Sequence, residues 1–213
     1  MSMNKAIHGA FRRDLDRFIE ALAVFPAGDR ARARQLTTAW ANFDDQLTHH
    51  HEGEHEIAWP ALLSVGVSAQ LLEAMDAEHD TMAAALTDTR AAMAALVRDP
   101  GAEQVSAAAG SFRTLKTVTV THLDHEEAEL EPVYQAKRDT PEITAMGKAF
   151  GKSGGLARGG RFLAWVLDGA SPEERAGVTA SVPGPVLAMV GGIFGRGYRK
   201  EVAPVWAGSA RTR

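Results

Sequence analysis

The sequence predicts an all-α protein, an antiparallel up-down-up-down four-helix bundle with additional C-terminal helices. Apolar residues recur every three or four positions along four long segments, which is the period of one helix face. Short stretches with turn-forming residues separate these segments, so that neighbouring helices reverse direction. Beyond residue 139 the helical patterns are shorter and contain more Gly and Pro.

The first two predicted helices span residue 4 or 5 to residue 25 and roughly residues 30–63. A turn over residues 26–29 joins them, and Asp29 is placed to cap the second helix because its side chain can accept a hydrogen bond from a free backbone N–H. Pro60 lies near the end of the second helix, where the loss of one backbone donor is tolerated or bends the helix.

The third and fourth predicted helices cover about residues 69–98 and 102–137, and the sequence Asp-Pro-Gly at residues 99–101 separates them. Pro132 lies in the fourth helix as Pro60 lies in the second. We therefore expect two parts, a bundle over residues 1–138 and a helical C-terminal extension over residues 139–213 that packs on the bundle.

Three short helices are expected in this extension, at residues 160–167, 172–182 and 183–206. Ser171 followed by Pro and two Glu is a typical helix start. The apolar run at residues 182–194 is too short and too interrupted to cross a bilayer, so a membrane partner is not expected. The extension either enlarges the core, covers a site or docks another subunit, which leaves a homo-oligomer open.

The composition excludes several classes of protein. The chain has 23 basic and 27 acidic residues and a net charge of -4, without a concentrated basic face, so nucleic acid is not an expected partner. Because there is no Cys, disulfides and thiolate metal sites are excluded. Charges near the N-terminus interrupt the apolar run that a secretory signal would need, so a cytoplasmic location is expected.

Polar residues interrupt the apolar stripes at spacings that repeat. His50 and Glu54 stand four residues apart on the stripe of the second helix, and His122 and Glu126 repeat this pair with an offset of 72 residues. One further histidine interrupts the stripe of the first helix, and another that of the third. The set that shares this pattern is His8, His50, Glu54, His79, His122 and Glu126.

These six side chains can meet inside the bundle. At ~1.5 Å of rise per residue, counting from the turns brings them within a few Å of one level. Each unpaired buried polar group costs about 1–3 kcal/mol, and a bound metal removes that cost. Imidazole and carboxylate together suit iron best, with manganese or zinc as weaker choices. Because a carboxylate can span two ions, the two Glu suggest a pair of iron ions.

The same pattern, with the sequences WPAL at residues 59–62 and EPVY at residues 131–134, resembles the hemerythrin-like (HHE cation-binding) family over roughly residues 5–137. The resemblance implies an oxo- or hydroxo-bridged non-heme di-iron centre in a four-helix bundle. It implies a protein that binds oxygen, senses oxygen or iron, or acts on peroxide, nitric oxide or ferrous iron. The ligands that it implies, with both Glu bridging, are His8, His50, Glu54, His79, His122 and Glu126.

Two departures from the oxygen-carrying members bear on function. Their HxxxxD spacing in the fourth helix would select Glu127 rather than Glu126. Their third helix shows HxxxH, whereas here Met75 and Ala83 stand four residues before and after His79. One imidazole fewer predicts a more open site, which favours chemistry on a bound small molecule.

We therefore expect a di-iron oxidoreductase that acts on O2, peroxide or ferrous iron. The alternatives are an oxygen or iron binding or sensing module without turnover, and a metal-stabilised structural protein.

Several residues beside the six are left open as ligands. His51 and His55 form another pair four residues apart, rotated by about 100° from the first, and we interpret them as solvated or as groups that orient the ligands. His125 and Glu127 are similar candidates.

Overall fold

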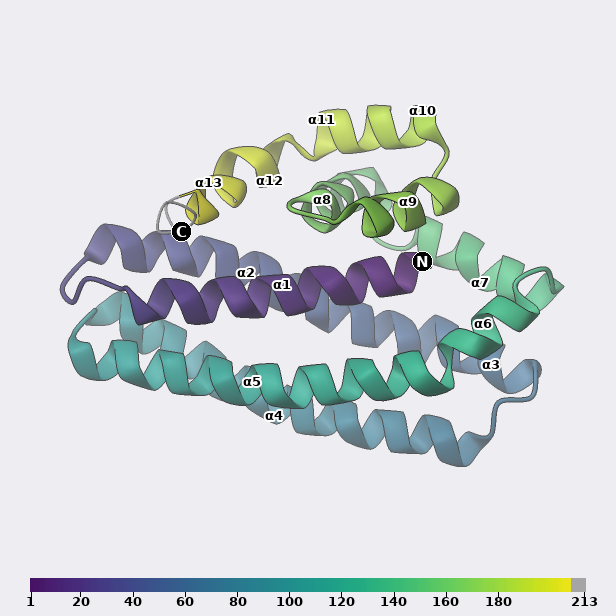
Figure 1. Cartoon of the computed structure of the whole chain (residues 1–213), viewed down its shortest axis with the longest axis horizontal. Coiled ribbons are helices and arrows are strands. Elements are labelled where there is room, and N and C mark those ends of the chain that lie inside the picture. The colour runs from purple at the N-terminus through teal and green to yellow at the C-terminus, as the bar shows by residue number, and fades with distance from the viewer. Residues whose placement is uncertain (208–213) are drawn as a thin grey trace.

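The computed structural model describes residues 1–207. These residues form helices and no strand, so the all-α prediction is confirmed. Four long helices lie side by side along the longest axis of the molecule (Figure 1). Helix α1 packs against α2 and α5, and α4 packs against α2 and α5, so each long helix contacts two others. Their bounds are α1 Met3–Ala23, α2 Arg30–Gly53, α4 Ala69–Arg98 and α5 Ala102–Glu129.

Short side chains cap three of these helices. The Asp29 carboxylate accepts a hydrogen bond of 2.9 Å from the Arg32 N–H, which confirms the predicted cap of α2. The hydroxyl of Ser68 does the same for α4, and the hydroxyl of Ser2 for α1. Gly28 has a φ of 89°, a conformation that suits glycine, and its N–H donates a 2.7 Å hydrogen bond to the Pro100 carbonyl. That bond ties the turn before α2 to the turn before α5.

The predicted helix over residues 30–63 is interrupted. After α2 comes a π-helical turn, η1 Glu54–Ala58, and then α3 Trp59–Ser64. Pro60 has no N–H, and its ring clashes with the carbonyl four residues earlier, so the preceding turn widens. The Trp59 N–H then bonds the Glu54 carbonyl five residues back.

The predicted helix over residues 102–137 is likewise two helices, α5 and α6 Glu131–Lys137. The break at Leu130 falls two residues before Pro132, whose missing N–H and fixed φ start α6. Both prolines therefore end or distort a long helix shortly after a Glu of the HxxxE pattern.

The C-terminal extension differs from its prediction in two ways. An additional helix, α7 Pro141–Lys152, precedes α8 Gly155–Leu167 and α9 Pro172–Ser181. The Ser171 start of α9 is confirmed and forms a capping box with Glu174. The single helix expected at residues 183–206 is instead divided at glycines and a proline, which lower helical stability. Its parts are α10 Gly184–Val186, η2 Leu187–Gly191, α11 Gly192–Phe194, α12 Arg196–Glu201 and α13 Ala203–Trp206.

Buried polar contacts attach the extension to α1, above which α8 and α9 lie in Figure 1. The buried Asp14 carboxylate accepts a 2.8 Å hydrogen bond from Nε1 of Trp165. Arg17 bridges Asp14 and Asp168, with N–O distances of 3.1 and 3.0 Å. A buried carboxylate needs such partners, because an unpaired one is costly.

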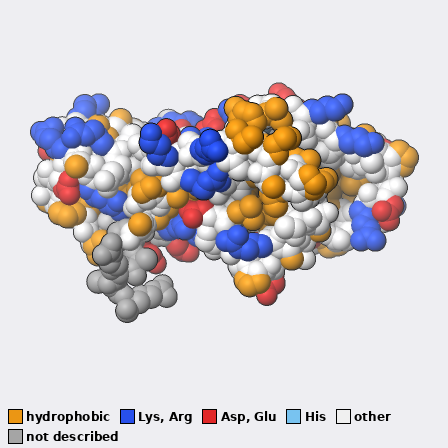
Figure 2. Space-filling view, turned by 90° about the horizontal axis from the view of Figure 1, so that it is seen from above, with side chains coloured by type: hydrophobic (Ala, Val, Ile, Leu, Met, Phe, Trp, Pro, Cys, Tyr) orange, Lys and Arg blue, Asp and Glu red, His pale blue; other side chains and the backbone are white. Residues whose placement is uncertain are grey.

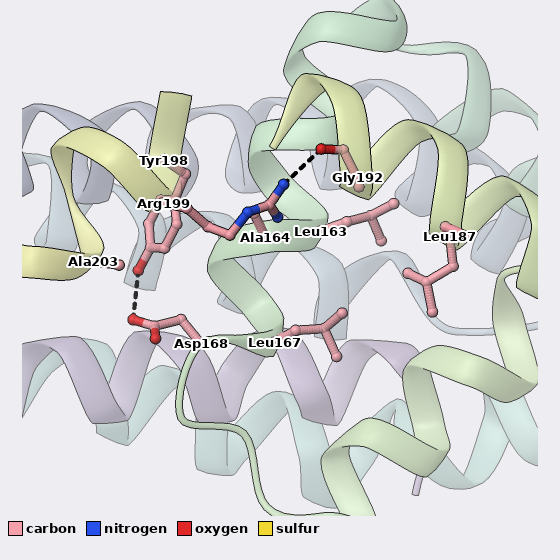
Figure 3. Close-up of a pocket in the computed structure, with 11 residues that line it drawn as sticks. Leu163, Ala164, Leu167, Asp168, Leu187, Gly192, Tyr198, Arg199 and Ala203 are labelled. Carbon is pink, nitrogen blue, oxygen red and sulfur yellow. Dashed lines mark hydrogen bonds between the residues drawn. The ribbon is translucent and has the colours of Figure 1, made fainter. Parts of the chain in front are cut away.

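The extension also contains a hollow of about 340 Å³ between α8, η2 and α12. Figure 3 shows its polar groups paired with one another: the Tyr198 hydroxyl donates to Asp168 at 2.9 Å, and Arg199 donates to the Gly192 carbonyl at 2.7 Å. Leu163 and Leu187 form part of its apolar wall.

The outer face of the extension is apolar over α10 to α11, where Figure 2 shows hydrophobic side chains gathered. Met189 and Ile193 are 57% and 51% exposed. Among residues 1–207, no individual helix has both the length and the apolar content for crossing a membrane. One bent pair within these residues reaches that length and apolar content when its two helices are counted together. The pair is Pro172–Ser181 and Gly184–Phe194, which meet at 106°.

Candidate metal centre

Each of the four long helices turns polar side chains toward the interior. His8 lies on α1, His50 near the end of α2, and Glu54 is the first residue of η1. His79 lies on α4, and His122 and Glu126 on α5. The structure brings together all the residues that the sequence singled out, and it adds His51.

The first cluster contains His8, His50, Glu54 and Glu126. One ligand atom from each lies within 4.8 Å of the others. Nε2 of His8 is 3.0 Å from a carboxylate oxygen of Glu126, and Nε2 of His50 is 3.1 Å from Oε1 of Glu54. This cluster therefore offers two imidazoles and two carboxylates.

The second cluster contains His51, Glu54, His79 and His122, again within 4.8 Å of one another. Nε2 of His79 is 3.3 Å from Oε2 of Glu54 and 3.1 Å from Nε2 of His122. Glu54 thus belongs to both clusters and presents a different oxygen to each. A carboxylate in this position can hold two cations at once.

Helix geometry explains how His50 and His51 serve different clusters. On a helix with 3.6 residues per turn, His51 lies about 100° and Glu54 about 40° around the axis from His50. Because α2 packs against both α1 and α4, adjacent residues face adjacent helices. The His51 ring accordingly stacks on His79 of α4, with ring centroids 4.2 Å apart, while His8 of α1 contacts His50 at 5.4 Å.

The sequence left His51 open because its apolar periodicity did not show which helices flank α2. His51 also supplies an imidazole beside His79, where Met75 and Ala83 of α4 supply none. A more open site was expected because α4 lacks this imidazole. Since His51 of α2 supplies an imidazole to the same cluster, the structure gives less reason to expect an open site.

A family model for the hemerythrin HHE cation binding domain matches residues 3–134. The chain belongs to this family. The matched range contains every residue of the two clusters and excludes the C-terminal extension from α7 onward. Neither curated proteins nor solved structures gave a match to the chain.

In this hemerythrin-like domain, carboxylates lie behind several of the imidazoles. Nδ1 of His8 is 3.0 Å from Oε1 of Glu127, which also accepts a 2.7 Å hydrogen bond from Arg12. Glu127 is therefore turned toward the far nitrogen of His8 and lies outside both clusters. Such a carboxylate fixes the ring orientation and strengthens imidazole as a ligand.

A similar arrangement supports the second cluster. Nδ1 of His122 is 2.8 Å from Oε2 of Glu78, whose other oxygen is 2.8 Å from Nδ1 of His125. His125 thus contacts Glu78 and belongs to neither cluster. His55 is also outside, since its side chain is 70% exposed and its Nδ1 lies 3.5 Å from Asp76.

Burial and neighbouring charges shift the pKa values in the clusters. Burial lowers the pKa of His50 and of His51, and the surrounding imidazoles lower both further. Burial, with the nearby Glu126, raises the pKa of Glu54. Burial alone would also lower the pKa of His8, but the adjacent carboxylates of Glu126 and Glu127 outweigh it and raise the pKa to about 9.

The chemistry of the donor set fits a cation. Among residues 1–207, six buried atoms of the clusters make no well-formed hydrogen bond: Nε2 of His8, His50 and His51, both oxygens of Glu54, and Oε2 of Glu126. Two pairs of them only face each other, His8 with Glu126 at 3.0 Å and His50 with Glu54 at 3.1 Å. Each unsatisfied group costs about 1–3 kcal/mol, so a protein would not retain six of them together without compensation. A cation held among these atoms would supply that compensation.

Proposed function

We propose that this hemerythrin-like chain binds two iron ions, one at each cluster, and binds and reacts there with O2, peroxide or ferrous iron. The observation that supports this proposal is the position of Glu54, whose two oxygens face different clusters. The proposed ligands are His8, His50, Glu54, His79, His122 and Glu126.

Iron is proposed because of the types of ligand. Imidazole nitrogens and carboxylate oxygens are the donors of many non-heme iron sites, whereas magnesium and calcium prefer oxygen alone. Zinc is a weaker choice because its sites are most often built from nitrogen and sulfur ligands, and manganese because it is suited to oxygen ligands. When bound, a pair of iron ions supplies redox chemistry toward small oxygen species.

The protein residues hold, orient and shield the ligands. Glu127 and Glu78 fix the orientation of His8 and His122 from behind the rings. The Phe11 ring packs on His50 with centroids 5.3 Å apart, which helps to exclude water from the first cluster. Because Glu54 and Glu126 are 3% and 1% exposed, the proposed substrates are small molecules rather than polymers.

We also propose an up-down-up-down bundle over residues 1–138 as the unit that holds the ions, with a helical extension packed on it from residue 139 onward. The last residues of the predicted extension, 208–213, lie outside the described part of the chain. The matched range at residues 3–134 and the contacts of Trp165 with α1 support this division.

An oxygen or iron binding or sensing module without turnover is the second candidate. The position of His51 favours it, because an additional imidazole in the second cluster leaves fewer coordination positions for a reacting molecule.

Metal analysis of protein purified without added iron tests the proposal. We expect about two iron atoms per chain in the wild type and a loss of both in Glu54→Ala, since Glu54 faces both clusters. Glu126→Ala should lower the iron content as well. One zinc per chain, or no metal, would overturn the di-iron proposal.

Rapid-mixing absorption spectra of the reduced iron protein separate the two candidates. Repeated turnover with peroxide or ferrous iron supports the oxidoreductase. A stable adduct with O2 that releases O2 reversibly supports the binding module and contradicts turnover.

A further inference from the structure

The internal repeat of the sequence is broken at one ligand position. The offset of 72 residues pairs His50 with His122 and Glu54 with Glu126, but it pairs His51 with Leu123. Leu123 is a fully buried core residue. A symmetric site would have no imidazole at position 51.

The structure reflects this break in the composition of the clusters. The first cluster has two imidazoles and two carboxylates, as the repeat predicts for both. In the second cluster, His51 takes the place that symmetry would give to Glu126, so the cluster has three imidazoles and one carboxylate. The two clusters are therefore chemically unequal.

The surroundings of His51 suit a ligand. Its ring lies between two others of the second cluster, stacked on His79 at 4.2 Å and edge-on to His122 at 5.9 Å. Its Nε2 is buried and has no hydrogen-bond partner among the described residues. A histidine that served only as packing would leave this nitrogen unsatisfied at a cost, as a leucine at the same position would not.

We propose that His51 is a ligand of the cation in the second cluster, and that it makes the two cation positions unequal in affinity and metal preference. This inference rests on the proposed binding of two cations. Imidazole-rich sites favour Co²⁺, Ni²⁺, Zn²⁺ and Fe²⁺, whereas carboxylate oxygens favour Mn²⁺ and Mg²⁺. The second cluster therefore fills first with Co²⁺, and the first cluster accepts Mn²⁺ more readily.

Titration of the metal-free chain with Co²⁺, followed by visible absorption and by calorimetry, tests this inference. We expect two binding events of different affinity in the wild type. His51→Leu reproduces the residue of the other repeat, and we expect it to weaken the tighter event by at least about tenfold, because even residues that only orient ligands have effects of this size. The weaker event should be little changed.

His49→Leu is the matched control. It changes a neighbouring histidine of the same tract, whose Nδ1 lies 3.8 Å from Glu52 and which belongs to neither cluster. We expect His49→Leu to bind Co²⁺ as the wild type does. His51→Gln, with circular dichroism of the metal-free form, provides a second variant if His51→Leu does not fold.

The outcomes separate this inference from the proposed function. Two Co²⁺ ions bound equally well by the wild type and by both His51 variants would overturn the role of His51 and leave the two-cation proposal intact. A wild type that binds no cation would overturn both. A loss of the tighter event in His49→Leu as well as in His51→Leu would assign that event to the surface tract and contradict the inference.

Discussion

Oε2 of Glu78 lies 2.8 Å from Nδ1 of His122, on the opposite side of the ring from the Nε2 that faces His79. Glu78 thus holds the ring so that Nε2 is directed into the second cluster. Because Glu78 is partly exposed, the pair is worth more for orientation than for folding stability. Neither the spacing of the HxxxE pattern nor the apolar stripes singles out Glu78.

We predict that Glu78→Gln weakens cation binding by about 10- to 100-fold while the chain stays folded, because the amide holds the ring less strongly. Co²⁺ titration measures the effect, and circular dichroism checks the fold. His125→Gln is the control, since His125 contacts the other oxygen of Glu78 and belongs to neither cluster. Equal effects of both variants would show that Glu78 acts through general packing.

Removal of the metal should lower thermal stability. Without cations, six buried cluster atoms make no well-formed hydrogen bond within residues 1–207. A ligand present at a thousandfold excess over its Kd adds about 4 kcal/mol to the free energy of unfolding, which corresponds to a shift in Tm on the order of 10 °C for a chain of this size. Differential scanning calorimetry with and without a chelator measures the shift.

Glu54→Ala provides the control for this prediction. Because Glu54 belongs to both clusters, its variant should have the same Tm with and without the chelator. A wild type whose Tm does not respond to the chelator would argue against cations as part of the native interior.

The long elements and the candidate ligands could be predicted from the sequence. The third helix was predicted at residues 69–98 and lies there, since Ser68 caps its start and Pro100 follows its end. The positions of the candidate ligands followed from apolar stripes, because a histidine among leucines on one helix face is directed into the core. These are local patterns, and local patterns are visible in one sequence.

The remainder depends on contacts between segments. His51 faces the second cluster only because α2 lies between α1 and α4, which the sequence of α2 alone does not specify. The π-helical turn at Glu54–Ala58 follows from Pro60. From the sequence, we expected Pro60 only to remove one backbone donor, which the helix tolerates or answers with a bend. In the extension, glycines and a proline divide residues 183–206 into short helices, and the apolar pattern does not show such breaks.

The close contact between α8 and η2 predicts that an added methyl group destabilises the chain at Gly160 but not at the adjacent Gly159. A Cβ at Gly160 would lie 2.6 Å from the Val190 carbonyl oxygen, so the two segments would have to separate. We predict that Gly160→Ala destabilises the chain by about 1–3 kcal/mol, as overpacked cores do. Urea unfolding followed by circular dichroism measures the change.

Gly159→Ala is the matched control. A Cβ there would meet only Val190 Cγ1 at 4.0 Å, an ordinary contact. Because Ala favours helix over Gly by up to about 1 kcal/mol, this variant should be neutral or more stable than the wild type. Equal destabilisation by both variants would contradict the close packing of α8 against η2.

The buried Tyr198 predicts a loss of stability at alkaline pH. Burial raises the pKa of Tyr198 well above 10, and the carboxylates of Asp14 and Asp168 raise it further. The folded state therefore holds the phenolic proton more tightly than the unfolded chain, whose tyrosines titrate near ~10. The resulting stabilisation is complete below pH ~10 and is lost as the pH rises above it.

Tyr198→Phe isolates this contribution. At neutral pH it removes the hydrogen bond to Asp168, and we expect a loss of about 0.5–1.5 kcal/mol. Above pH ~10 the wild type should lose stability more steeply than the variant, because only the wild type can ionise at this position. Thermal melts across the alkaline range measure both slopes, and parallel slopes would show that Tyr198 titrates alike in the folded and unfolded states.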